Sequence, residues 1–288
     1  MLPGIVCGIS GARDAVNVMR RFFATIAGRP GIIRNSGSRK NVDRGWQTQG
    51  ISRLFTLVML DRGKHIITSF DAALNSLKND ALMMSSLAER LLENAIQGLL
   101  KRDSNLCNLA IADDEEVDVL EKQIDKEGVE IMIRFHPVAS DMRQVISTMK
   151  LSSNLERIAD QSVVIARRAK KLNLRPAVPE IFLLEPLYRE AMGIFRDSLR
   201  AFVDGDAELA LKLKPRDRYL DTLNSGLNDK LAERMGIDPD QVPIYLNIIF
   251  IARALERIGD HATNIGEDAF WQEQAEDIRH TFGAVQEE

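Results

Sequence analysis

The chain has few cysteines and no long uninterrupted run of apolar residues. Cys7 and Cys107 are its only two cysteines, too few for a disulfide framework and without zinc-ribbon spacing, and this usage fits a reducing cytosol. The longest apolar stretches, at residues 54–60 and 244–255, are shorter than the roughly 18 residues that span a bilayer. The sequence therefore predicts a cytoplasmic protein, whose contact with a membrane would come only through a partner.

The chain also lacks an excess of basic residues. It has 38 Lys and Arg residues against 42 Asp and Glu residues, for a formal net charge of −4. Proteins that bind DNA or RNA through the phosphates usually carry a clear positive excess, so we expect no nucleic-acid partner. The sequence contains no Gly-rich phosphate loop, nucleophile elbow or Ser/His/Asp set, so we predict no catalytic residues.

The first 50 residues differ in composition from the rest of the chain. They hold eight basic and two acidic residues, many Gly and Ser residues, and no helical or strand period. We therefore interpret residues 1–60 as an N-terminal extension that is disordered and outside the core, with Met59 as an alternative start of the folded part. An Arg-rich, acid-poor N-terminus is also compatible with an organelle transit peptide.

From about Ser69 onward, apolar residues recur at helical spacing, with almost no β-branched alternation. The Pro-containing segment 174–180 separates two halves of three helices each. Asp238, Pro239 and Gln241 fit an N-cap, a first helical residue and a capping box, and mark the start of the last helix. We predict helices at about residues 70–101, 104–134, 139–172, 180–203, 206–235 and 239–274.

The two halves are similar in sequence. Residues 155–160 read LERIAD and residues 255–260 read LERIGD, at an offset of 100. Residues 103–118 align with residues 206–221 at an offset of 103. This second alignment places Asp103, Leu106, Asp114 and Asp118 on Asp206, Leu209, Asp217 and Asp221, all identities. A repeat of this size indicates duplication of one helical unit.

The helical period and the repeat together predict an all-α fold of two pseudo-repeated three-helix bundles. We place the first bundle at residues 65–175 and the second at residues 176–275. Residues 276–288 form a C-terminal tail in this interpretation.

Pairs of acids four residues apart recur at matching places in both halves. On a helix, residues i and i+4 share a face, with their Cβ atoms about 5–6 Å apart. Glu156 and Asp160 therefore point the same way, and they border the apolar stripe that includes Leu155 and Ile158. The four pairs are Asp114 with Asp118, Glu156 with Asp160, Asp217 with Asp221, and Glu256 with Asp260.

Two acid pairs on neighbouring helices repel each other unless a cation neutralises them. The pattern therefore predicts one metal site of oxygen ligands in each repeat, which favours hard cations. His261 follows Asp260, but Gln161 holds the equivalent place, so no histidine joins the pattern symmetrically. The alternative is a solvated acidic face whose acids pair with Arg157 and Arg257, since about six such acid pairs are expected by chance.

The paired hexapeptides, together with PVASDMR at residues 137–143 and ADDEEVDVLEKQID at residues 112–125, resemble the PhoU family across residues 65–274. The resemblance implies a cytoplasmic regulator of phosphate uptake that is not an enzyme and that reaches the inner membrane through its partners. Those partners would be the phosphate ABC transporter and a phosphate-sensing histidine kinase. It also implies a homodimer that represses phosphate-starvation signalling when phosphate is plentiful.

The resemblance further implies bound metal ions, with iron, zinc, manganese and magnesium as candidates, held by the repeated acidic motifs. Ala159 stands where this family usually has Gly, and the first sixty residues have no counterpart in it. Carried onto this sequence, the ligands would be Asp114, Asp118, Glu156, Asp160, Asp217, Asp221, Glu256 and Asp260.

Two functions of other classes are compatible with the acidic repeats. A di-iron carboxylate oxidoreductase would use such carboxylates, but that class usually carries Glu-x-x-His ligands, and none occurs at the pair positions. A plain helical scaffold without metal is the second alternative. Metal analysis of the purified protein separates the scaffold from the other two, and an oxygen-consumption assay identifies the oxidoreductase.

Overall fold

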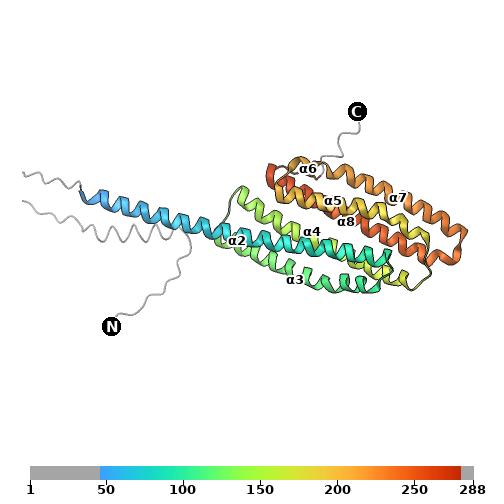
Figure 1. The fold of residues 1–288 in the computed structure, drawn as a ribbon. Helices are drawn as coiled ribbons and strands as arrows, with labels where there is room; N and C mark the ends of the chain where they lie inside the picture. Colours follow the sequence, from blue (N-terminus) through green and yellow to red (C-terminus); the bar gives the residue numbers. More distant parts are fainter. Residues whose placement is uncertain (1–45, 280–288) are drawn as a thin grey trace, which may run out of the picture. The chain divides into compact units, whose positions relative to one another are not determined.

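The computed structural model describes the backbone of residues 46–279 and the side chains of residues 68–279. Every regular element within residues 46–279 is helical, so the predicted all-α fold of two three-helix repeats is confirmed (Figure 1). The first repeat contains α2, α3 and α4, and the second contains α5, the short α6, α7 and α8. The helices are α2 (Trp46–Leu100), α3 (Ser104–Phe135), α4 (Ser140–Asn173), η1 (Pro179–Leu184), α5 (Glu185–Asp204), α6 (Ala207–Leu211), α7 (Leu213–Ile237), η2 (Pro239–Gln241) and α8 (Val242–Gln274).

Helices α4 and α8 pack against each other in the middle of the folded unit, with α3 on α4 and both α5 and α7 on α8 (Figure 1). Residue numbers rise along α4 as they fall along α8, so the two helices are antiparallel. Three contacts establish this register: Arg143 Nε with the Gln272 carbonyl oxygen (3.0 Å), Asn154 Oδ1 with His261 Nδ1 (3.2 Å), and Arg168 Nη1 with Asn247 Oδ1 (3.1 Å). The segments 155–160 and 255–260 therefore lie beside each other, at the centre of a pseudo-two-fold arrangement.

The apolar stripes beside the two hexapeptides form the centre of the core. Their side chains are almost fully removed from water, which is the main favourable term in folding. A buried Leu or Ile side chain contributes roughly 1.5–3 kcal/mol relative to an exposed one. The buried members of the two stripes are Leu151, Leu155, Ile158 and Ile165 on α4 and Ile251, Leu255, Ile258 and Ile265 on α8.

Two predicted helix starts are wrong and one predicted helix is interrupted, and a proline explains each difference. Proline cannot donate the bond to the carbonyl four residues earlier, and its ring collides with that carbonyl. Pro186 therefore prevents an α-helix that begins at residue 180, and the chain forms η1 before α5 begins at Glu185. Pro215 likewise breaks the predicted helix 206–235 at Lys212, between α6 and α7.

The start of the last helix differs from the prediction for the same reason. A helix that began at Pro239 would need the absent N–H of Pro243 for its first regular bond. The chain instead forms η2, and α8 begins at Val242 with Pro243 in its first turn. The carboxylate of Asp238 makes no capping hydrogen bond, so the predicted capping box does not form.

The first helix begins earlier than predicted, because α2 starts at Trp46 instead of near residue 70. Residues 46–60 of the predicted N-terminal extension lie in this helix, as does Met59, and the placement of the extension outside the core stays a prediction. Composition was the wrong guide here, since the stretch between Pro30 and Pro137 contains no proline to end a helix. Residues 1–45 of the predicted N-terminal extension, and residues 280–288 of the predicted tail, lie outside the described part of the chain.

Candidate metal centres

The predicted site residues lie on two pairs of adjacent helices. We call Asp114 and Asp118 of α3, with Glu156 and Asp160 of α4, the first acid cluster. We call Asp217 and Asp221 of α7, with Glu256 and Asp260 of α8, the second acid cluster. Because α3 packs on α4 and α7 packs on α8, each cluster joins acids from two helices of one repeat.

Within the first acid cluster, the carboxylates raise each other's pKa. Desolvation raises the pKa of Asp114, and the charges of Asp160 and Asp118 raise it further. Desolvation also raises the pKa of Glu156, again with an added contribution from Asp160. Acids from α3 and α4 therefore lie close enough to repel one another when ionised.

Arg157 partly compensates this charge. Its Nε lies 3.2 Å from Glu156 Oε2, and its Nη1 lies 3.6 Å from Asp160 Oδ2. Neither contact satisfies Glu156 Oε2, which is buried and has no hydrogen-bond partner in the protein. A buried carboxylate oxygen without a donor is costly. The predicted pairing of Arg157 with the acids is thus present, but it does not satisfy the cluster.

Glu121 belongs to the same environment, although the repeat pattern did not identify it. It lies one turn after Asp118 on α3, and its charge raises the pKa of Glu156. Desolvation, with the charges of Asp125 and Asp118, raises the pKa of Glu121 itself. The aligned residue of the second repeat is Asn224, so a search for acids shared by both repeats passes over this one. Its helical spacing from Asp118 was the available signal.

The second acid cluster contains the most deeply buried carboxylate of the eight predicted residues. Asp217 is 3% exposed, and its Oδ2 lies 3.3 Å from Lys214 Nζ. Its other oxygen, Oδ1, is buried without a hydrogen-bond partner. Desolvation raises the pKa of Asp217, whereas the charge of Lys214 lowers it. Lys214 is an internal counter-ion that the first repeat lacks, because the aligned residue there is Ile111.

Asp260 shows the largest effect of the crowded charge. It is open to solvent on one side, but partial desolvation raises its pKa to about 6, with further contributions from Asp217, Glu256 and Asp221. Desolvation also raises the pKa of Glu256, with Asp221 as the next cause. The four acids of the second cluster therefore interact across the α7–α8 interface, as those of the first do across α3 and α4.

Small residues on the central helices allow the outer helices to approach closely. A Cβ atom added at Gly259 would lie 2.3 Å from Leu220 Cδ2 and 3.5 Å from Asp217 Oδ1. Gly259 therefore sets the distance at which α7 presents its acids to α8. In the first repeat Ala159 aligns with Gly259, and Val117 aligns with Leu220. The extra methyl group on the central helix is thus matched by a smaller residue on the outer helix.

A second pair of positions shows the same exchange. A Cβ atom at Gly266 would lie 2.4 Å from Leu213 Cδ1. The aligned residues of the first repeat are Ala166 and Ala110. The small residue is thus on the central helix in one repeat and on the outer helix in the other.

The carboxylates of the two acid clusters are not arranged as a complete metal site. Among residues 68–279, no three His, Cys, Asp or Glu side chains stand close enough together to hold a metal ion. The chemistry of the clusters nevertheless fits a hard cation, because the donors are carboxylates and each cluster has a buried oxygen without a partner.

Comparison with known proteins places this arrangement in a family. A model of the PhoU domain matches the chain twice, at residues 82–169 and 184–269, once in each repeat. The chain belongs to the PhoU family. The resemblance drawn from the sequence motifs is therefore confirmed. The two matches lie within the predicted repeats, whose boundaries at residues 65–175 and 176–275 stay predictions.

Named PhoU proteins cover most of the chain. A PhoU homologue of Pseudomonas putida is 35% identical over 75% of this chain and 85% of its own length. The Escherichia coli PhoU protein is 33% identical over 78% of this chain and 93% of its own length. Both carry the description of an accessory protein of a phosphate-specific transport system.

Two solved PhoU structures have the same fold. The crystal structure of PhoU from Pseudomonas aeruginosa aligns with a TM-score of 0.70 and 33% identity, and covers 72% of this chain and all of its own. PhoU from Streptococcus pneumoniae aligns with a TM-score of 0.65 and 25% identity, over 73% of this chain and 99% of its own.

Family membership decides between the functional classes left open by the sequence. PhoU proteins are regulatory accessory proteins, so the chain is not an enzyme and the di-iron oxidoreductase alternative is wrong. Within residues 46–279, no helix is long and apolar enough to cross a membrane.

Proposed function

We propose that this protein regulates phosphate uptake and represses phosphate-starvation signalling when phosphate is plentiful. It would act in the cytoplasm as a homodimer, at the inner membrane, through the phosphate ABC transporter and a sensor histidine kinase. The observation that carries the proposal is the double match to the PhoU domain, one in each three-helix repeat. The descriptions of the relatives as accessory proteins of phosphate-specific transport support it.

A clean deletion in the host bacterium tests this function. Loss of the protein should raise expression of a phosphate-starvation reporter in phosphate-rich medium, and the full-length gene supplied in trans should restore repression. The same strain should show no change in a reporter for an unrelated nutrient, which serves as the control. Unchanged phosphate-starvation expression in a strain without a second PhoU gene would contradict the proposal.

We further propose that each acid cluster holds metal, with iron, zinc, manganese and magnesium as candidates. Bound metal would supply positive charge at the point where two helices present carboxylates to each other. Glu156 and Asp217 are the anchors of the two sites in this proposal, because each has a buried carboxylate oxygen without a partner. The remaining six acids of the clusters complete the ligand sets, and the hard oxygen donors favour iron(III), manganese and magnesium over zinc.

The chain's own residues determine what metal would do to the fold. Each cluster lies across an outer and a central helix, so an ion bound to both carboxylate sets would hold α3 to α4 and α7 to α8. Arg157 contacts two acids of the first cluster, and Lys214 contacts Asp217 in the second. Metal and these cations compete for the same carboxylates. Metal content would therefore alter the rigidity of both helix pairs.

Chelation and charge-neutralising variants test the metal sites. Metal that binds only the folded state raises stability by about 2.7 kcal/mol when its concentration is 100 times the dissociation constant. We expect chelator to lower the melting temperature of the native protein, and to lower it less for the double variant Glu156→Gln, Glu256→Gln. The matched control is the double variant Glu115→Gln, Glu208→Gln, which removes the same two charges from exposed positions, one in each repeat. If chelator does not change the melting temperature of the native protein and elemental analysis finds no metal, the metal-free helical scaffold is the correct hypothesis.

A further inference from the structure

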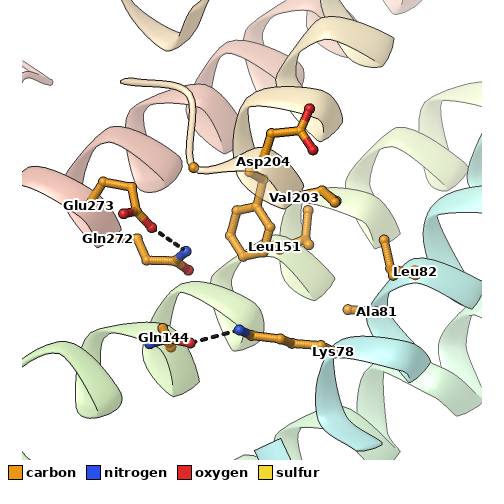
Figure 2. Close-up of a pocket in the computed structure, with 11 residues that line it drawn as sticks. Lys78, Ala81, Leu82, Gln144, Leu151, Val203, Asp204, Gln272 and Glu273 are labelled. Atoms are coloured by element: carbon orange, nitrogen blue, oxygen red, sulfur yellow. Dashed lines mark hydrogen bonds between the residues drawn. The ribbon is translucent and has the colours of Figure 1, made fainter. Parts of the chain in front are cut away.

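A pocket of about 270 Å³ lies away from both acid clusters, between α2, α4 and the C-terminal ends of α5 and α8 (Figure 2). Its apolar wall includes Ala81, Leu151 and Phe202. Its charged groups include Lys78 on the α2 side and Glu273 on the α8 side, as Figure 2 shows. The pocket thus combines an apolar body with charge at two separate ends, which is typical of a small-molecule or side-chain site.

Gln272 is the group that gives this pocket a chemical preference. Only 8% of its surface is exposed, yet its Oε1 is buried without a hydrogen-bond partner. Its Nε2 donates to Glu273 Oε1 at 3.1 Å, which fixes the orientation of the amide (Figure 2). The reverse orientation would place two acceptors against each other, so the amide nitrogen faces Glu273 and the oxygen is turned away from it, toward the other lining residues (Figure 2). This unused acceptor lies in the wall of the pocket, and an occupant with a donor reaches it when the Gln272 side chain turns toward the pocket.

Glu273 is held in place by the turn after α5. Gly205 ends that helix in the left-handed conformation, at φ 66°, and a Cβ atom there would lie 3.1 Å from Glu273 Cδ. The carboxylate thus lies against bare backbone, next to the amide nitrogen of Gln272. Asp204, beside it on α5, adds a second carboxylate to the lining of the pocket.

Lys78 is engaged at the other end of the pocket. Its Nζ donates to Gln144 Oε1 at 2.7 Å, on the α4 side (Figure 2). One cation faces two carboxylates among the lining residues, so the pocket carries a net negative charge. An anionic ligand could reach Lys78, but it has no donor for Gln272 Oε1. A cation with N–H groups satisfies that oxygen and the carboxylate of Glu273 together.

We propose that this pocket binds an organic cation with a short alkyl chain, an alkylammonium or alkylguanidinium group. The N–H groups donate to Gln272 Oε1 and Glu273, and the alkyl chain lies along the apolar wall. Exposed apolar side chains at the mouth, Leu82 at 42% and Val203 at 56% exposure, extend that wall outward. Such a cation is found both in free amines and in the Lys and Arg side chains of proteins.

Ligand titrations of the full-length protein by NMR test the proposal. With few heavy atoms to contribute, butylammonium and butylguanidinium should bind with dissociation constants on the order of 1 mM. Butyrate, with the same chain and the opposite charge, should bind at least about tenfold more weakly. N-acetylarginine amide distinguishes the two sources. Binding as tight as that of butylguanidinium indicates a protein side chain, and weaker binding indicates a free amine.

Variants of the lining residues should change the affinity of the pocket in opposite directions for a cation and for an anion. Gln272→Met and Glu273→Gln should each weaken butylammonium binding by about tenfold, since each removes one charge-assisted contact. Lys78→Met should tighten it, because a like charge is removed from the pocket. Glu276→Gln, an exposed change outside the lining, is the control and should leave the affinity unchanged.

Two results would overturn the proposal. One is butyrate binding as tightly as butylammonium, with Lys78→Met weakening both. The other is no binding of either cation at about ten times the expected dissociation constant. Chemical-shift spectra of each variant without ligand show whether it is folded, so that loss of binding is not confused with loss of structure.

Discussion

Replacing Gly259 by Ala tests whether helix spacing at the second acid cluster is set by the size of one residue. In an open helix this change stabilises by about 0.5–1 kcal/mol, because Ala restricts the unfolded chain and favours helix. At Gly259 the new Cβ atom would lie 2.3 Å from Leu220 Cδ2, and Leu220 is fully buried. Overpacking of this kind costs about 1–3 kcal/mol. We therefore expect Gly259→Ala to destabilise by about 0–2.5 kcal/mol, the difference of the two effects.

The aligned residues of the first repeat supply the compensating change. Leu220→Val alone should cost about 0.5–1.5 kcal/mol, by loss of one buried methylene. The double variant Gly259→Ala, Leu220→Val recreates the combination found at Ala159 and Val117, so the added methyl group has room. It should be more stable than the sum of the single changes predicts, with a coupling free energy of about 1–3 kcal/mol.

Urea unfolding of the four proteins at 25 °C, in the presence of chelator, measures this coupling. The control is Gly226→Ala on α7, where an added Cβ atom meets nothing within 4 Å and the change should stabilise. The reasoning would be refuted if Gly259→Ala stabilised as much as Gly226→Ala and the coupling with Leu220→Val were near zero. That result would mean that α7 moves freely against α8, and that Gly259 does not set the spacing of the acids.

Three further predictions concern the charges. In metal-free protein the pKa of Asp260 is raised to about 6, so the folded protein holds this proton more tightly than the unfolded chain does. The resulting stabilisation of the fold is complete at a pH below 3.8, the usual pKa of an Asp side chain, and is lost as the pH rises through about 6. Thermal melts in chelator should accordingly show a higher melting temperature at low pH than at neutral pH, and Asp260→Asn should reduce this pH dependence. An identical pH dependence of the melting temperature in the variant would argue against a raised pKa at Asp260. Lys214→Met should lower the melting temperature of the metal-free protein, because Asp217 loses its ion pair. It should also increase the rise in melting temperature that added metal causes, as measured by differential scanning calorimetry. An unchanged rise would show that Lys214 and metal do not compete for Asp217. Glu121→Gln should weaken metal binding at the first cluster, measured by isothermal titration, whereas Glu116→Gln, at an exposed position of the same helix, should not.

The fold could be predicted because its signals are local and repeated. Apolar residues at helical spacing identified the buried stripes, and Leu155 and Ile258 are both fully buried as their spacing required. The helix starts were less predictable, since a proline tolerated in a first turn is excluded a few residues later. Pro215 and Pro243 therefore moved the boundaries, while the apolar period continued on both sides of them.

Only those residues of the candidate site that occur at matching positions in both repeats could be predicted from the sequence. Acids on one helix face are visible in the sequence, because i and i+4 spacing is a property of the helix alone. The counter-ion Lys214 and the additional acid Glu121 each occur in one repeat only, so a search for matching positions did not identify them. Gln272 was also missed, because only the packing of four helices shows that its amide oxygen is buried without a partner.

These differences indicate how the two halves diverged after duplication. Both kept the four acids, and both kept the helix spacing, with Ala159 and Val117 in one repeat matching Gly259 and Leu220 in the other. The electrostatic surroundings changed instead. The first cluster gained Glu121, an acid without a counterpart in the second repeat, whereas the second has Lys214 within 3.3 Å of Asp217. The first cluster has five acids with Glu121 included and Arg157 against two of them, whereas the second has four acids and Lys214 against Asp217, so two sites built from the same motif would bind metal with unequal affinity.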